Sequence, residues 1–166
     1  MPFDMQPTLI GSYVHLRPLA SSDYDALYSV ASDPLIWEQH PSPDRFKEDV
    51  FGKFFAEAIE SGGAMLISDR ETGEVIGSSR FHGYSEQRSE VEIGWTFLAR
   101  SRWGGQFNGD LKSVMTTHAF KFVDSILLII NPINMRSRRA AEKIGAIADP
   151  DLCRDGRMIY RLQRAA

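Results

Sequence analysis

The chain has 166 residues, 43% of them apolar and 25% charged, which is typical of one globular domain. Nineteen basic and 22 acidic residues give a net charge of −3, a balance that argues against a nucleic-acid or anionic-membrane partner. The single cysteine, Cys153, excludes a disulfide framework within the chain and a cysteine-rich zinc site, and we expect no metal. No apolar run is long enough to span a bilayer and no secretory signal is visible, so we expect a cytoplasmic domain.

The first third of the chain predicts a strand followed by a helix. Residues 1–7 carry two prolines and no periodicity, so we expect a loose leader. Alternation over residues 9–19 predicts a strand that ends near Arg17. A capping-box pattern at Ser22–Asp25 precedes apolar residues at helical spacing, and the Asp33-Pro34 pair ends that helix.

The middle of the chain predicts a second helix and three strands. Asp44 is expected to cap a helix that ends at Gly62. Residues 64–68 and 75–81 flank a turn and predict a hairpin, and residues 90–98 alternate as a strand. On that strand we expect one face to carry Val91, Ile93, Trp95 and Phe97, and the other to carry Glu92, Gly94, Thr96 and Leu98.

The last third predicts two helices and two strands. A glycine turn at 103–105 precedes a long helix, whose apolar stripe includes His118 as a structural residue. Residues 126–130 are a continuous apolar run, typical of a buried central strand. Asn134 is expected to cap a short helix, and residues 157–162 form the last strand. The order βααβββαβαβ predicts an α/β or α+β sheet with helices on its faces.

The glycine turn before the long helix is the first candidate site. The free N–H groups at a helix start, together with the helix dipole, can bind a phosphate or pyrophosphate. Gly104 and Gly105 would let the backbone approach such a ligand closely. A tight turn with no ligand explains the same two glycines, because the pattern matches neither a Walker loop nor G-x-G-x-x-G.

Four short motifs, taken together, resemble the GNAT superfamily of acyl-CoA-dependent N-acetyltransferases. They are Glu92-Ile93-Gly94-Trp95, Trp103-Gly104-Gly105-Gln106-Phe107-Asn108, Asn134-Met135-Arg136-Ser137 and Glu142-Lys143-Ile144-Gly145-Ala146. The likeness extends over residues 10–162 and is greatest to the branch of ribosomal-protein N-terminal acetyltransferases. It implies one acetyltransferase domain over residues 1–166.

The resemblance also implies a fold and an activity. The fold would be a mixed, mostly antiparallel sheet of six to seven strands with helices on both faces, splayed between its fourth and fifth strands. Acetyl-CoA would lie in the split as co-substrate, and a primary amine would attack its thioester directly in a ternary complex. The amine could belong to a protein N-terminus, a polyamine, an amino acid or an antibiotic, and a longer acyl group and a homodimer stay open.

Three positions depart from the pattern of this family. Gln106 and Asn108 are bulkier than the residues expected in the cofactor loop, although a backbone N–H donor does not require glycine. Ala141 stands where many relatives have a tyrosine that protonates the leaving thiolate. These departures motivate an alternative, a non-catalytic acyl-CoA-binding protein on the same scaffold.

The resemblance assigns roles to residues that also have ordinary explanations. Glu92 would be the general base, with Glu90 on the same face as second candidate and acceptor contact, although a solvated strand glutamate is the plain alternative. Ser137 would assist the leaving sulfur, or simply bond to its own helix. Trp37 and His40 would shape the acceptor site, or pack an aromatic loop onto the core.

The cofactor contacts implied by the resemblance form the largest set. They are Phe97, Leu98, Arg102, Trp103, Gly104, Gly105, Gln106, Phe107, Asn108, Gly109, Asn134, Arg136 and Arg139. Asn134 is equally well explained as an N-cap, and the arginines as a solvated helix face. A nucleic-acid module built on the arginines is a third possibility, against which the net negative charge argues.

Overall fold

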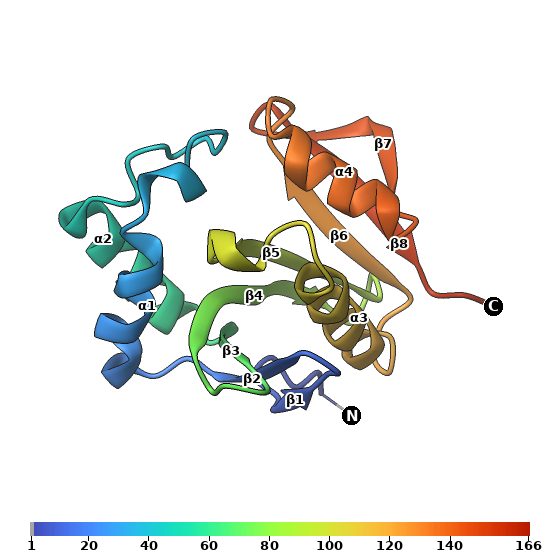
Figure 1. The fold of residues 1–166 in the computed structure, drawn as a ribbon. Helices are drawn as coiled ribbons and strands as arrows, with labels where there is room; N and C mark the ends of the chain where they lie inside the picture. The colour runs from blue at the N-terminus through green and yellow to red at the C-terminus, as the bar shows by residue number, and fades with distance from the viewer. Residues whose placement is uncertain (1) are drawn as a thin grey trace.

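A computed structural model describes residues 2–166, which form one eight-stranded sheet with helices on both faces (Figure 1). Helices α1 (Tyr24–Ala31) and α2 (Glu48–Ser61) cover one face, and α3 (Phe107–Ala119) and α4 (Met135–Lys143) cover the other. The strands are β1 (Leu9–Ile10), β2 (Val14–Pro18), β3 (Ala64–Asp69), β4 (Val75–Ser85), β5 (Glu90–Leu98), β6 (Ser125–Ile130), β7 (Ile147–Arg154) and β8 (Arg157–Gln163). No helix in this part of the chain is long and apolar enough to cross a membrane.

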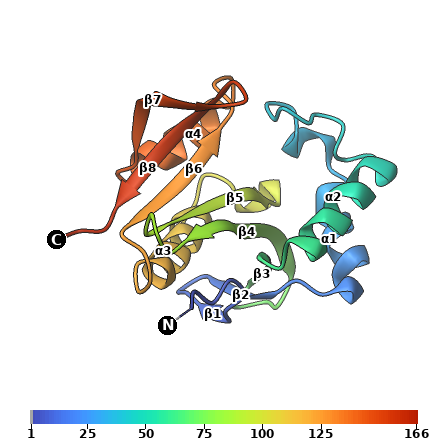
Figure 2. The same ribbon diagram turned by 180° about the vertical axis from the view of Figure 1, so that it is seen from behind.

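The sheet has the order β1-β2-β3-β4-β5-β6-β8-β7, and only β5 and β6 are parallel neighbours. These two strands pair over Glu90–Glu92 and Ser125–Leu127, whereas β5 continues to Leu98 and β6 to Ile130. The sheet therefore splays between β5 and β6, which separates two halves of the molecule (Figure 2). This confirms the predicted mixed, splayed sheet.

The strand count exceeds the predicted six to seven for two reasons. The expected first strand is broken into β1 and β2 by a turn, so the expected fourth and fifth strands are β5 and β6. The second reason is β7, which the sequence did not predict. None of its eight residues is buried, so it shows no alternation: the strand is an exposed edge, paired irregularly with β8. A strand with little buried surface leaves little hydrophobic pattern.

The predicted alternation of β5 holds up to Ile93 and then fails at a β-bulge. Trp95 has a φ of +54°, and the register against β4 shifts between the pairs Arg80–Gly94 and Ser78–Phe97. A bulge adds one residue to one strand and thereby exchanges the faces that follow it. Trp95 and Phe97 therefore join the core beneath α1 and α2, while Ile93 and Leu98 pack on the α3 side.

Two predicted helix starts are wrong in detail. Asp44 does not cap α2: the N-cap is Lys47, and the Asp44 carbonyl accepts the Lys47 N–H in a turn before the helix. Ser22 lies in a short 3-10 turn ahead of α1, where the Asp23 carboxylate accepts the Ala20 N–H at 2.8 Å and pairs with Arg17. At Asp23, a side-chain oxygen suited to capping thus serves the preceding turn instead, and at Asp44 the backbone carbonyl closes a turn before the helix begins.

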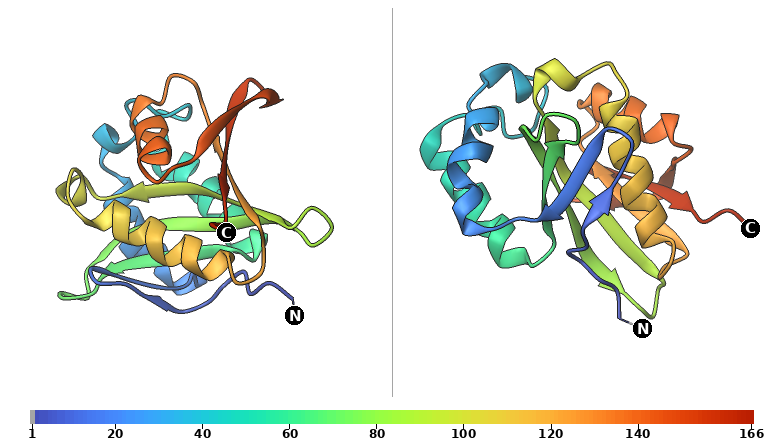
Figure 3. Two further views of the ribbon diagram at one scale, coloured as in Figure 1. Left: turned by 90° about the vertical axis from the view of Figure 1, so that its right-hand side faces the viewer. Right: turned by 60° about the horizontal axis from the view of Figure 1, so that its bottom comes forward.

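The N-terminal segment is joined to α3 in two places. Residues 2–7 form no helix or strand, but Phe3 is buried and packs against His118, whose Nε2 lies 2.8 Å from the Asp4 carbonyl. His118 is thus a core residue, as its apolar stripe predicted. The second link is Asp110 in the first turn of α3, whose carboxylate accepts the N–H groups of residues 12–14. The turn between β1 and β2 accordingly lies beside the start of α3 (Figure 3).

Candidate functional site

The splay leaves one edge of β5 without a strand neighbour. Beyond Glu92, no residue of β5 pairs with β6 within residues 2–166. The chain leaves β5 at Leu98 and reaches α3 through a 3-10 turn, Arg100–Arg102, and the glycine turn. The Leu98 carbonyl accepts a hydrogen bond from the Trp103 indole at 2.9 Å, which fixes this connection onto the end of the strand. The split thus leads directly to the start of a helix.

The glycine turn has the geometry expected of an anion site. Gly104 has a φ of +70°, which favours glycine, and a side chain at Gly104, Gly105 or Gly109 would meet open space. Gln106 is the N-cap of α3 but makes no side-chain capping bond, so the N–H groups of the first turn stay available. An uncapped start on a 13-residue helix, beside an open glycine turn, fits a pyrophosphate.

The three candidate cofactor arginines differ in their surroundings. Arg102 is committed to ion pairs with Asp69 at 3.1 Å and Glu74 at 3.0 Å, which tie the loop to the β3–β4 hairpin. Arg136 stacks on the Trp103 ring at 3.6 Å, and its guanidinium reaches the Ile36 carbonyl at 3.3 Å. Arg139 is exposed. Arg136 is therefore the arginine that links α4 to the other half of the molecule.

Asn134 is the N-cap of α4, as predicted. It is buried, and its Oδ1 accepts the Ser137 N–H at 3.2 Å. Its amide nitrogen makes no hydrogen bond to any of the residues the structure describes, so the donor side of the amide is free for a ligand. Ser137 is half-buried in the same turn. Capping therefore uses only the oxygen of the Asn134 amide.

The two strand glutamates are both buried but are electrostatically different. Burial raises the pKa of Glu92, and its nearest cation, Arg154, is 3.7 Å away. Burial acts in the same direction on Glu90, but hydrogen bonds from Arg88 at 2.6 Å and Arg161 at 3.1 Å outweigh it and hold its pKa below the usual range. A base must be able to accept a proton, so Glu92 is the better candidate and Glu90 serves as an ion-pair centre.

The predicted acceptor residues Trp37 and His40 lie in one aromatic cluster. Trp37 is 1% exposed, donates its indole N–H to the Ala31 carbonyl at 2.8 Å and packs on Phe97. His40 packs edge-on against Trp37, and its Nδ1 accepts the Ser42 N–H at 3.0 Å. Burial, with nearby arginines, lowers the pKa of His40 to about 4. Trp37 is thus a core residue of this loop, and His40 is neutral at pH 7.

The comparison with known families decides the class of the protein. The family described as Acetyltransferase (GNAT) domain has a model that matches residues 14–147. The chain belongs to this GNAT family. No curated protein matches the chain.

Solved structures with the same fold include three acetyltransferases. One is from Agrobacterium tumefaciens, with a TM-score of 0.77, 24% identity, and 95% of each chain covered. A GCN5-related N-acetyltransferase from Brucella melitensis has a TM-score of 0.80 and 19% identity, covering 98% of this chain and 80% of that one. Mycobacterium smegmatis RimJ in complex with CoA-disulfide has a TM-score of 0.71 and 18% identity, covering 98% and 90%. The TM-scores show that these proteins share the fold of this chain. With sequence identities this low, the likeness concerns the fold alone.

Sequence reasoning missed two arginines of this GNAT domain, the half-buried Arg45 and the buried Arg80. Arg80 occupies an inward position of β4 and is 5% exposed, and Arg45 follows the His40 loop. The available signal was an arginine inside the run 76–81, which is otherwise apolar or small. An arginine at a buried strand position is unusual enough to mark a site.

A third missed residue of the GNAT domain, Lys112, connects α3 to the bulged part of β5. Its ammonium group donates to the Thr96 hydroxyl at 3.1 Å, and this hydroxyl lies 2.8 Å from that of Ser79. Lys112 has no acidic partner within 4.0 Å among residues 2–166, and burial lowers its pKa to about 8. The helix that begins at the glycine turn is thereby anchored on the bulge through a buried cation.

Replacing Lys112 with Met should remove a pH dependence of stability. Between about 8 and 10.5, the folded and ordinary pKa values, the unfolded chain binds more protons at this residue than the folded chain. The free energy of unfolding of the wild type therefore rises with pH relative to K112M. Below that window the wild type bears the full cost of a buried charge, so K112M is the more stable protein. Urea unfolding at about pH 7 and about pH 10 measures the free energy of unfolding of both proteins. A difference between wild type and K112M that is the same at both pH values would contradict the prediction.

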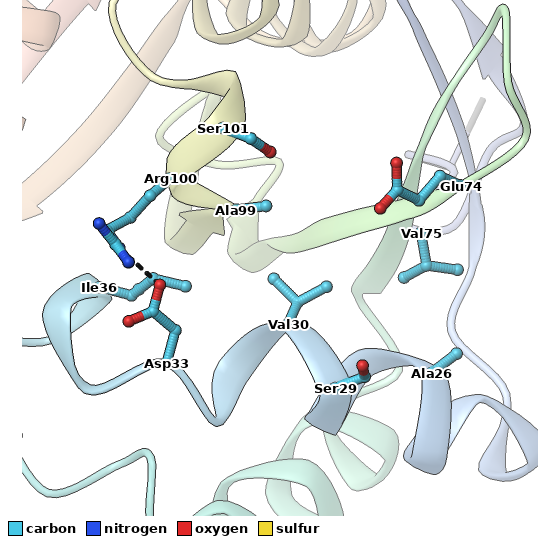
Figure 4. Close-up of a pocket in the computed structure, with 10 residues that line it drawn as sticks. All are labelled: Ala26, Ser29, Val30, Asp33, Ile36, Glu74, Val75, Ala99, Arg100 and Ser101. Atoms are coloured by element: carbon cyan, nitrogen blue, oxygen red, sulfur yellow. Dashed lines mark hydrogen bonds and ion pairs between the residues drawn. The ribbon is translucent and has the colours of Figure 1, made fainter.

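A surface pocket of about 720 Å³ lies apart from the predicted site residues (Figure 4). It is formed by α1, the start of β4 and the 3-10 turn after β5, and it is crossed at one side by an ion pair between Arg100 and Asp33 at 2.5 Å. None of the predicted site residues lines it. No group of three or more His, Cys, Asp or Glu side chains that could hold a metal occurs in residues 2–166.

Proposed function

We propose that the protein is an N-acetyltransferase that transfers the acetyl group of acetyl-CoA to a primary amine within a ternary complex. The observation that carries the proposal is the split between β5 and β6. The split leads to the uncapped start of α3, and the buried Glu92 lies where the two strands separate. An anion site and a candidate base thereby lie on one continuous path. A cytoplasmic location and a possible homodimer belong to the same proposal.

In this proposal the cofactor is held by backbone groups and by α4. The pyrophosphate binds the N–H groups of residues 104–109, and the free Asn134 amide donates to the pantetheine arm. Arg136 and Arg139 on α4 contribute positive charge, whereas Arg102 acts by holding the loop in place. The N–H groups near Phe97 and Leu98, on the open edge of β5, bind the thioester oxygen and the oxyanion that develops from it.

The chemistry requires one proton acceptor and little acid catalysis. Glu92 takes the proton from the amine, directly or through water, as the nitrogen attacks the thioester carbon. The carbon–sulfur bond then breaks, and the thiolate, with a pKa near 8.5 by analogy with cysteine, leaves almost unaided. Ala141 is buried where many relatives have a tyrosine, so Ser137 or water supplies the final proton. An α-amine, with a pKa near 8, demands less of the base than a lysine side chain near 10.4.

A free-thiol release assay tests the proposed activity. The protein is incubated with acetyl-CoA and a panel of small amines, amino acids and peptides, and thiol appearance is followed against a protein-free control. Amine-dependent thiol release supports the proposal. Tight acetyl-CoA binding without turnover over the whole panel would instead favour a non-catalytic acyl-CoA-binding protein.

Acetyl-CoA should also stabilise the folded protein. At a free concentration about 100 times Kd, linkage gives a stabilisation of about 2.7 kcal/mol, because the ligand binds only the folded state. Differential scanning fluorimetry with acetyl-CoA up to millimolar concentrations measures the shift in Tm. ATP at the same concentration is the control for phosphate charge alone. A folded protein whose Tm does not move would contradict the cofactor assignment.

A further inference from the structure

Two arginines beneath α2 share an aromatic surface. Arg80 projects from β4, and its guanidinium carbon lies 4.3 Å from the ring centre of Trp95 and 5.7 Å from that of Phe54. Arg45 lies 4.4 Å from the same Phe54 ring and 5.3 Å from that of Trp37. Two cations thus lie on one phenylalanine ring, between the helix and the sheet.

Neither arginine has an acidic partner. No carboxylate of residues 2–166 lies within 4.0 Å of either guanidinium, whereas seven other arginines of this part of the chain form ion pairs. The Nε atoms of Arg45 and Arg80 are buried without a hydrogen-bond partner, and the one side-chain bond of Arg45 is to the Ser42 hydroxyl at 3.3 Å. A charge left unpaired away from water is costly, so an anion that comes from outside would stabilise this pair.

The electrostatics agree with that geometry. Burial, followed by repulsion from Arg80, lowers the pKa of Arg45 to about 10. Burial also lowers the pKa of Arg80, and the carboxylates of Glu57 and Glu92 offset it only in part. Cation–π contacts with Trp95 and Phe54 stabilise the guanidinium groups without using their in-plane N–H donors, of which only one, on Arg45, is bonded within residues 2–166, to Ser42.

Arg80, one of the two arginines, lies beside the candidate base. Arg80 is the direct cross-strand partner of Gly94, and Glu92 points to the same face of β5 two residues earlier. A side chain at Gly94 would come within 3.3 Å of the Glu92 carboxylate, so the glycine keeps the space between Glu92 and Arg80 open. Adjacent strands are about 5 Å apart, which places a proton acceptor and an anion receptor within reach of one small molecule.

We propose that the acetyl acceptor is a small amino acid, whose carboxylate binds Arg80 and Arg45 while its amine faces Glu92. The inference rests on the proposed acetyltransferase activity and names its substrate class. In a free α-amino acid, one carbon separates the amine from the carboxylate. A peptide N-terminus has a neutral amide at that place and would leave both guanidinium groups unpaired. Gly94, between the two groups, accommodates the α-carbon.

The test compares matched acceptors that differ only in charge. The rate of thiol release from acetyl-CoA is measured with the twenty amino acids and with their C-terminal amides. We expect kcat/KM for the best amino acid to exceed that for its amide by about 10- to 100-fold, the usual effect of losing a charge-assisted hydrogen bond. Equal or faster turnover of the amides, or turnover confined to peptides with an acidic side chain, would overturn the inference while the acetyltransferase activity stands.

Variants of the two arginines show whether they make that distinction. In R80Q the preference for the amino acid over its amide should fall by at least about tenfold. In R80K the preference should fall less, because lysine keeps the positive charge but lacks the paired N–H donors of the guanidinium group. R45Q should, independently, also lower the preference for the amino acid over its amide. K121Q removes an exposed charge in the turn after α3 and should leave the preference and the activity unchanged. Circular dichroism and acetyl-CoA affinity establish that each variant is folded.

Equilibrium binding keeps the inference separate from the activity. Amino acids at millimolar concentration should raise the Tm of the wild type, and of the wild type with CoA, but not that of R80Q. If no amine is turned over, the proposed function fails and this binding alone decides the anion site. The absence of any shift with all twenty amino acids would then overturn the anion site as well.

Discussion

Replacing Glu92 with Gln is expected to lower kcat by about 10²–10⁴, the usual contribution of a general base. Glutamine keeps the size and reach of the buried side chain but cannot accept a proton near neutral pH. The affinity for acetyl-CoA should hardly change, because the proposed cofactor contacts are at the glycine turn and on α4. Steady-state kinetics and isothermal titration measure the two quantities separately.

The pH profile distinguishes a base from a residue that only positions the substrate. Burial raises the pKa of Glu92, so the acidic limb of kcat/KM in the wild type should lie above the ordinary glutamate range. In E92Q that limb should disappear, and activity should recover partly at high pH as more of the amine becomes neutral. A residue that only positions the substrate would, when replaced, raise KM at every pH.

Glu90 is the matched control for this experiment. E90Q removes a buried carboxylate from the same face of the same strand, but one whose charge is balanced by Arg88 and Arg161. We expect E90Q to lower the free energy of unfolding and to reduce kcat far less than E92Q. Full activity of E92Q at pH 7 together with a large loss in E90Q would transfer the role to Glu90.

Replacing Gly105 with Pro is expected to weaken acetyl-CoA binding by about 10- to 100-fold or more. Proline removes one N–H donor and restricts φ at the place where the turn must surround the pyrophosphate, and a lost bond to a charged group accounts for a change of this size. The folded state should change little, because Gly105 is exposed and its surroundings are open. Isothermal titration with CoA measures the affinity, and thermal unfolding without ligand measures stability.

Gly105→Ala is the matched control at the same position. An alanine side chain there meets no atom within 4 Å, φ is outside the left-handed region, and the N–H is retained. G105A should therefore bind CoA like the wild type. Equal affinity of G105P and G105A would place the pyrophosphate elsewhere.

The parts of the fold that could be predicted are those with a strong local pattern. The continuous apolar run of β6 and the Asn134 cap of α4 are determined by neighbouring residues, and both were predicted. The β5 bulge could not be predicted, because Trp95 is compatible with either face and the added residue depends on pairing with β4. Edge strand β7 has too little buried surface to leave a pattern.

The candidate site shows the same division. The glycine turn and Glu92 were predicted as candidates from short local motifs. Arg45 and Arg80 are separated by 34 intervening residues and meet at Phe54 on α2. Trp37 was predicted near the acceptor from its loop, yet burial makes it a support for that loop. Arg80 alone has a local signal, its place in an apolar run, but its pairing with Arg45 is a tertiary contact and has none.

The Asp110 carboxylate makes the N-terminal segment a reporter of α3, the helix of the proposed cofactor site. Three backbone amides, those of Ser12, Tyr13 and Val14, depend on this one side chain in the first turn of α3. Local opening of that turn must release all three amides together, so their deuterium uptake would follow the fluctuations of a helix to which they do not belong. A spectroscopic label near β1, outside the split, could then register cofactor occupancy without touching the ligand.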